Sequence, residues 1–179
     1  MRRLKRYIIV AILLGTTGTI LADDYALTER YFLRYDMEVA QKQQSLVAQM
    51  QELFNSPSID SSDLNQLEMQ FSRQLTGLID GDDTLRLKGT KLSAIHNELQ
   101  QVKAVWKETQ AAMKKALKSS KYRKEAQQYF SRLLQCVNSA VMAYDKSYQR
   151  YKQRSQLSAI VNSYVNHKKS DRLALNTIK

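Results

Sequence analysis

Apolar side chains recur at intervals of three and four residues along most of the chain, which is the spacing of amphipathic α-helices. Helix-breaking residues are scarce: from Asp23 to Lys179 there are one proline and three glycines. Since proline and glycine interrupt helices, their scarcity favours long ones. The breaks fall at residues 56–61, 81–90 and 119–120, so the pattern predicts four helices.

The third predicted helix has the most regular pattern, with a heptad spacing typical of helices that pack at a shallow angle. Its apolar stripe consists of Leu92, Ile95, Leu99, Val102, Trp106, Thr109, Met113 and Ala116. The fourth helix shows no breaker from residue 121 to 165, but its stripe ends near Tyr151. Beyond that point the apolar positions move to Leu157, Ile160, Val161, Tyr164 and Val165. We expect the fourth helix either to bury another side there or to leave the bundle.

Short connections imply antiparallel neighbours. The predicted fold is therefore all-α: an antiparallel, up-down-up-down four-helix bundle with a long fourth helix. At 1.5 Å per residue, the first and third helices would reach roughly 45 Å, the second about 27 Å and the fourth about 65 Å. No strand is expected.

The first 22 residues have the layout of a secretory signal peptide. Four basic residues precede an apolar run, and Ala22 stands before two aspartates. We expect cleavage after Ala22 and a periplasmic or secreted protein; the alternative is an uncleaved N-terminal membrane anchor. Residues 23–165 would then form the bundle, and residues 166–179 a basic C-terminal tail.

Charge is distributed unevenly along the chain. Residues 1–22 carry a net charge of +4, residues 23–120 of −2 and residues 121–179 of +9. In an exported protein, such a basic segment favours an anionic lipid, an envelope polymer or an acidic protein over nucleic acid. A solvated basic helix face is the simpler alternative.

Candidate catalytic chemistry is sparse. No acid, cysteine or second histidine stands at metal-ligand spacing from His96 or His167. No Ser/His/Asp set and no glycine-rich phosphate loop is present in the sequence, and the lone Cys136 excludes an internal disulfide. We therefore expect a non-enzymatic protein without a metal or cofactor. Asp80, Asp82 and Asp83 lack the rest of a calcium-loop pattern and indicate a polar helix end.

Two groups of residues are candidates for binding. Arg30 and Arg34 lie one helical turn apart near the start of the first helix, where arginine side chains can hold a small oxyanion or simply be solvated. The second group mixes aromatic and basic side chains on the fourth helix, a mixture that can serve nucleic acid. Because its tyrosines lie on the core stripe, core or interface packing with exposed polar ends is the favoured interpretation, and the group is the candidate partner-binding surface. It consists of Tyr144, Tyr148, Arg150, Tyr151, Lys152 and Arg154.

Three sequence patterns together resemble a known family. They are the leucine-rich segment 75–82 ending in Asp-Gly-Asp, Val102 with Trp106, and the apolar segment 133–141. In this order the patterns resemble the N-terminal sensory domain of type IV pilus methyl-accepting chemotaxis transducers (PilJ-like), which also occurs in NarX-like nitrate sensor kinases. The resemblance covers roughly residues 26–160.

The resemblance implies a periplasmic four-helix sensory bundle that works as a homodimer through the first helix. It also implies that an arginine from each subunit meets a small anion at the dimer axis. Ala26 and Arg30 match that motif, whereas Leu27 and Tyr31 replace its glycine and methionine. The later arginine of the motif falls on Tyr35, with Arg34 one position earlier. Leu27 would obstruct the close approach that glycine permits.

The leading functional hypothesis is thus a non-enzymatic periplasmic sensory bundle. It binds a nitrate-like anion and acts through a membrane sensor or transducer, since the sequence shows no second membrane span after the fourth helix. The alternative is a structural or adaptor protein of the cell envelope that holds an acidic partner through its basic fourth helix.

Overall fold

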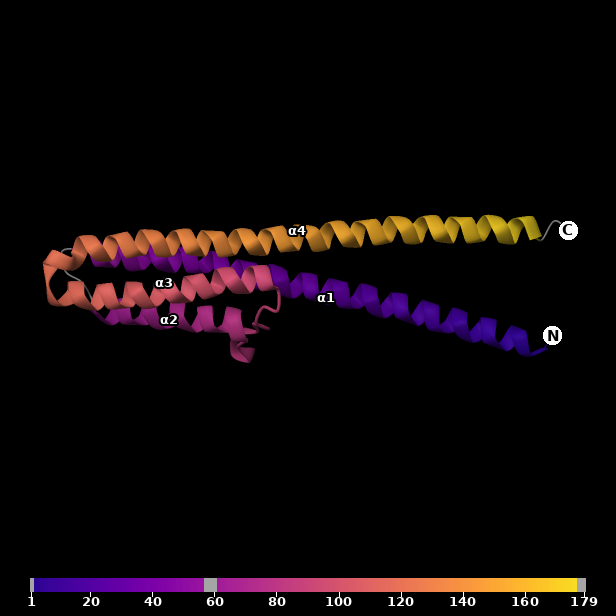
Figure 1. Cartoon of the computed structure of the whole chain (residues 1–179), viewed down its shortest axis with the longest axis horizontal. Coiled ribbons are helices and arrows are strands. Elements are labelled where there is room, and N and C mark those ends of the chain that lie inside the picture. The colour runs from indigo at the N-terminus through magenta and orange to yellow at the C-terminus, as the bar shows by residue number, and fades with distance from the viewer. Residues whose placement is uncertain (1, 57–60, 177–179) are drawn as a thin grey trace. The chain divides into compact units, whose positions relative to one another are not determined.

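The computed structural model describes the backbone of residues 2–56 and 61–176, and the side chains of residues 28–56 and 61–167. Within these residues the chain is all-helical and has no strand. Four long helices follow one another: α1 (Arg2–Asn55), α2 (Ser61–Asp80), α3 (Ser93–Lys118) and α4 (Arg123–Asn176) (Figure 1). Two 3₁₀ helices, η1 (Asp83–Leu85) and η2 (Ser120–Tyr122), lie in the connections.

The outer bounds of the first and last helices differ from those expected. The bundle was expected to start at residue 23, whereas α1 begins at Arg2 and continues without a break past Ala22. α4 continues beyond Val165 to Asn176, so the expected basic tail begins as helix. The signal-peptide prediction concerns side chains outside the described residues and stays a prediction, and residues 57–60 of the expected break at 56–61 also lie outside them. No helix in the described part of the chain is long and apolar enough to cross a membrane.

The chain divides into two compact units, which we describe separately. The core unit comprises Phe32–Ser147, and the terminal unit comprises Met1–Tyr31 together with Tyr148–Lys179. α1 and α4 contribute residues to both units, whereas α2 and α3 belong to the core unit alone.

The interior of the core unit consists of the apolar stripes of all four helices. The heptad stripe of α3 is confirmed from Ile95 to Ala116, and only Leu92 at its start is half-exposed. Aromatic rings join the helices: the Phe71 and Trp106 ring centroids lie 4.6 Å apart, and those of Phe54 and Phe130 lie 5.7 Å apart. The largest fully buried side chains include Tyr144, Phe54, Phe71, Phe130, Met50, Leu64 and Leu78.

Hydrogen bonds between side chains show the relative direction of neighbouring helices in the core unit. Gln44 of α1 donates to Asn138 of α4 at 2.7 Å, and Asn55 accepts from Gln127 at 2.8 Å. Residue numbers therefore rise along α1 as they fall along α4. α2 and α3 show the same relation, because Trp106 Nε1 donates to Ser72 at 2.9 Å and Gln110 to Glu68 at 3.3 Å. Figure 1 shows α2 and α3 side by side.

The connection between α2 and α3 is a compact loop that two glycines make possible. Gly81 has φ +98° and Gly89 has φ +71°, so both adopt the left-handed conformation that glycine tolerates best. Asp82 and Leu87 form an isolated β-bridge between these glycines, and the buried Leu87 side chain packs over Gly77.

Candidate functional site

Arg30 lies in the terminal unit and contacts two residues of α4. Its Nη1 atom donates a hydrogen bond to the Ser155 hydroxyl at 3.4 Å, and its Cζ atom lies 6.0 Å from the centroid of the Tyr148 ring. Ser155 in turn donates to the backbone carbonyl of Lys152 at 3.0 Å, which directs a hydroxyl lone pair toward Arg30. We refer to Arg30, Tyr148 and Ser155 as the Arg30 cluster. The cluster brings the expected anion-binding residue next to one of the expected partner-binding residues.

The groups that contact the charged side chain of Arg30 are neutral. No carboxylate forms an ion pair with it among the described residues, and both of its contacts, a hydroxyl and an aromatic face, are uncharged. A guanidinium group has five N–H donors, of which the cluster uses one. Arg30 is also half-buried, which strengthens any charge-assisted hydrogen bond that it makes. The cluster can therefore accept an oxyanion on the donors that remain.

Arg34, the second expected anion-binding residue, has a different environment. Its Nε atom pairs with Glu38 Oε1 at 3.2 Å in an i,i+4 arrangement on the surface of the core unit. Both side chains are at least half exposed, so this ion pair contributes only about 0.3–0.5 kcal/mol. The carboxylate nevertheless compensates the charge of Arg34, which makes Arg34 a weaker anion candidate than Arg30.

The residues expected to bind a partner divide by burial. Arg150, Lys152 and Arg154 are exposed, whereas Tyr148 and Tyr151 are half-buried. Tyr144 is fully buried in the core unit and cannot contact a partner, so its assignment as a partner-binding residue was wrong. Burial, and secondly the nearby charge of Asp36, raises the pKa of the Tyr144 hydroxyl, which therefore stays protonated.

Arg73, Asp82, Thr84 and Leu85 form a polar cluster in and beside the loop after α2, which the sequence patterns did not predict. Asp82 accepts hydrogen bonds from the backbone N–H groups of Thr84 and Leu85 and from the Thr84 hydroxyl, and it pairs with Arg73 at 3.1 Å. Arg73 also donates to the Thr84 hydroxyl. These contacts, led by the Thr84 hydroxyl, hold the pKa of Asp82 at about 2. The sequence pattern that could have predicted this turn is Asp-x-Thr at residues 82–84, in which the Asp side chain caps the backbone N–H groups of the residues that follow.

Asp82 is fully engaged in organising its loop, which supports the interpretation of the aspartate segment as a helix end. The described residues contain no cluster of three or more His, Cys, Asp or Glu side chains that could hold a metal ion. His96 shares a hydrogen bond of 3.2 Å with Gln100 one turn away. Burial raises the pKa of the half-buried Cys136 thiol, which disfavours the reactive thiolate.

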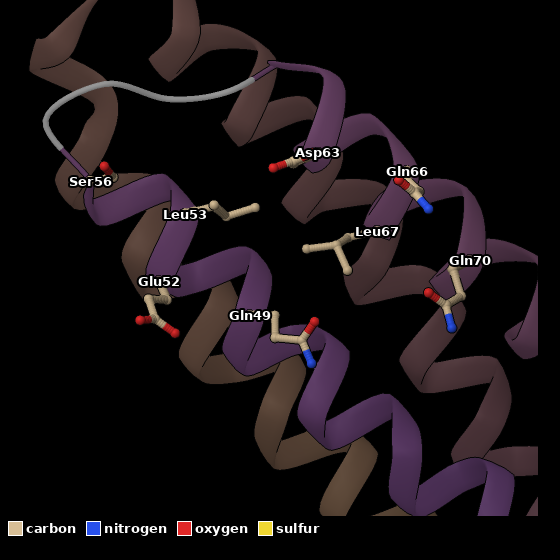
Figure 2. A pocket seen from close by; sticks show the side chains of 8 residues that line it. All are labelled: Gln49, Glu52, Leu53, Ser56, Asp63, Gln66, Leu67 and Gln70. Atoms are coloured by element: carbon tan, nitrogen blue, oxygen red, sulfur yellow. The ribbon is translucent and has the colours of Figure 1, made fainter.

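An open groove of about 560 Å³ lies between α1 and α2 in the core unit. Figure 2 shows Leu53 and Leu67 pointing toward each other across it, with polar side chains around them. The polar lining consists of Gln49, Glu52, Ser56, Asp63, Gln66 and Gln70. None of the expected binding residues lines this groove, and its lining includes neither histidine nor cysteine. It therefore offers shape and hydrogen-bonding groups.

In comparisons with known proteins, the chain matches no protein-family model, no curated protein and no solved structure. These comparisons therefore assign neither a family nor a function.

Proposed function

We propose that this chain is a non-enzymatic sensory-type protein of the cell envelope that binds a small oxyanion at Arg30. The observation that carries the proposal is the contact of Arg30 with Ser155 and Tyr148 of α4. An anion on the remaining donors of Arg30 places a negative charge beside these contacts and so changes how α1 holds α4 in the terminal unit. Ligand binding is thereby linked to the helix that we expect to meet a membrane partner.

An antiparallel, up-down-up-down four-helix bundle is the arrangement that we propose for the core unit. It is supported by the opposed residue numbering of the α1–α4 and α2–α3 hydrogen bonds. The resemblance to PilJ-like and NarX-like sensory domains, a periplasmic location and a homodimer through α1 belong to the same proposal. They rest on the sequence patterns already described.

Calorimetry with nitrate and nitrite tests the anion proposal on the full chain. We expect heat of binding from at least one of these anions and an affinity at least about tenfold weaker in Arg30→Ala, because one charge-assisted hydrogen bond contributes about 1.5–3 kcal/mol. Arg34→Ala is the matched control, and it should retain binding because Glu38 already compensates that charge. Absence of heat with both anions, or equal heat from Arg30→Ala, would reject the proposal.

A second candidate function is that of an adaptor that holds an acidic protein. It is favoured by the exposure of Arg150, Lys152 and Arg154 along about one turn of α4. A pull-down at low and high salt, with and without residues 145–179, tests it. Capture that depends on this segment and weakens with salt is expected, whereas capture that ignores salt contradicts electrostatic binding.

A further inference from the structure

The last part of α4 exposes a row of large apolar side chains. Exposed fractions range from 44% to 67% across the row, although side chains of these types are usually buried. We refer to the row as the α4 stripe; it consists of Leu157, Ile160, Val161, Tyr164 and Val165. Spacings of three, one, three and one place its members on one face of the helix. A contiguous exposed apolar face of this kind marks an interaction surface.

The α4 stripe lies on the opposite side of α4 from the residues that contact Arg30. With 3.6 residues per turn, its centre lies roughly 160° around the helix from Tyr148 and Ser155. The face that continues from Ser155 instead carries the polar residues Ser158, Asn162 and Asn166. All side chains from Gln156 to His167 are exposed, so the apolar residues beyond Tyr151 are not buried within the chain. This segment is an amphipathic helix whose apolar side is open to solvent.

Basic residues lie next to the α4 stripe. Arg150 and Arg154 precede it on the same side of the helix, within about 50° of its centre, and both are exposed. From Tyr148 to His167 the chain contains three Lys or Arg residues and no Asp or Glu. In the sequence, Lys168 and Lys169 follow directly. The surface that the stripe presents is therefore apolar along its centre and cationic where it begins, at Arg150 and Arg154.

This charge pattern indicates which kind of partner can cover the α4 stripe. A second copy of the chain would bring together two segments (148–167) that each carry three basic and no acidic residues, which repels. An anionic surface instead complements the charge, and an amphipathic helix with basic residues binds the interface of an anionic bilayer with its apolar face inward. We propose that the α4 stripe docks onto an anionic phospholipid membrane surface. Arginine stems and the Tyr164 ring suit such an interface, because their polar ends reach toward the headgroups.

Vesicle co-sedimentation with the full chain tests this proposal. One set of vesicles contains phosphatidylcholine and phosphatidylglycerol in equal amounts, and the other contains phosphatidylcholine alone. We expect binding to the anionic set to be at least about tenfold tighter and to weaken as salt is raised. A triple variant, Leu157→Gln, Ile160→Gln and Val161→Gln, should lose at least about tenfold in affinity for the anionic vesicles.

The matched control carries glutamine on the polar face: Ser158→Gln, Asn162→Gln and Asn166→Gln. It should bind like the unchanged chain. Alanine at residues 157, 160 and 161 gives a second stripe variant with high helix propensity, so that loss of binding is separated from loss of helix. All variants share residues 1–22, whose own membrane affinity therefore cancels in the comparison.

Equal vesicle affinity of the stripe variants and the unchanged chain would overturn the proposal, as would equal binding to both kinds of vesicle. A dimer that the triple variant abolishes, without any vesicle binding, would assign the stripe to a second copy and likewise overturn it. The inference does not rest on anion binding by Arg30. Calorimetry with soluble anions and sedimentation with vesicles can therefore fail separately.

Discussion

At the scale of single residues, Asp82 links local chemistry to stability. Its carboxylate accepts hydrogen bonds from Thr84 and Leu85 and pairs with Arg73, and these contacts stabilise the charged form. Asp36 and Tyr144 are the contrasting case, because both are buried in the core unit. The nearby Asp36 charge adds to burial in keeping the Tyr144 hydroxyl protonated. Polar groups thus organise a loop at one site and lie inside the apolar core at the other.

The low pKa of Asp82 predicts a defined pH dependence of stability. In the folded chain the pKa is about 2, below the value of about 3.9 in an unfolded chain. The stabilisation is therefore fully present above about pH 4 and is lost as pH falls through about 2. We expect Asp82→Asn to melt below the unchanged protein at neutral pH, and the gap to close between about pH 4 and pH 2.

Thermal unfolding followed by circular dichroism over this pH range measures the effect. Asp83→Asn is the control, because the Asp83 side chain is exposed and forms no hydrogen bond or ion pair among the described residues. A constant gap between Asp82→Asn and the unchanged protein at all pH values would contradict the assignment.

At the scale of elements, the loop between α2 and α3 depends on close backbone contact at Gly89. A Cβ atom on this residue would lie 2.7 Å from the backbone nitrogen of Gly81 and 2.8 Å from the carbonyl carbon of Asp80. The left-handed φ adds a second penalty for residues other than glycine. Because Gly89 has no side chain, the loop before α3 can pack directly against the backbone at the end of α2.

We expect Gly89→Ala to lower the free energy of unfolding by roughly 1–3 kcal/mol, measured by urea denaturation. Gly89→Asn separates the two causes, because asparagine tolerates a left-handed φ but still carries Cβ. Equal losses in both variants would assign the effect to crowding. Gly77→Ala is the comparison within α2: the nearest atom there is the flexible Cδ1 of Leu87, so a smaller loss is expected. An unchanged Gly89→Ala variant would refute the argument.

At the scale of the whole molecule, the buried core and the proposed binding surfaces belong to different units. The large buried aromatic and aliphatic side chains lie in the core unit, whereas the side chains from Gln156 to His167 are exposed. Exposed side chains contribute little to the free energy of folding, because they remain in water. The terminal unit is therefore free to present the Arg30 cluster and the α4 stripe without a cost to the core.

This division predicts that a chain ending at Gln156 keeps the unfolding transition of the core unit. We expect its melting temperature to change by less than about 2 °C, which corresponds to under roughly 1 kcal/mol in a protein of this size. Phe130→Ala is the contrasting variant, since it removes a fully buried ring and should cost about 3–5 kcal/mol. Differential scanning calorimetry distinguishes the two. A large fall in the melting temperature of the shortened chain would mean that residues 157–179 stabilise the core.

The sequence by itself determined the helical class, the breaks at residues 81–90 and 119–120, and the buried stripe of α3 from Ile95 to Ala116. These features follow from local rules: glycine interrupts a helix, and a period of three and four residues defines a face. The sequence also located the change of face after Tyr151.

Only the tertiary structure decided what each face meets. It showed that Arg30 contacts Ser155 and Tyr148, that Tyr144 is buried, and that the α4 stripe is exposed. Gln43 illustrates the physical reason: it is buried although polar, because its amide donates to the backbone carbonyl of Phe71 at 3.4 Å. A periodic pattern fixes the side of a helix on which a residue lies, but burial depends on which distant residues lie opposite.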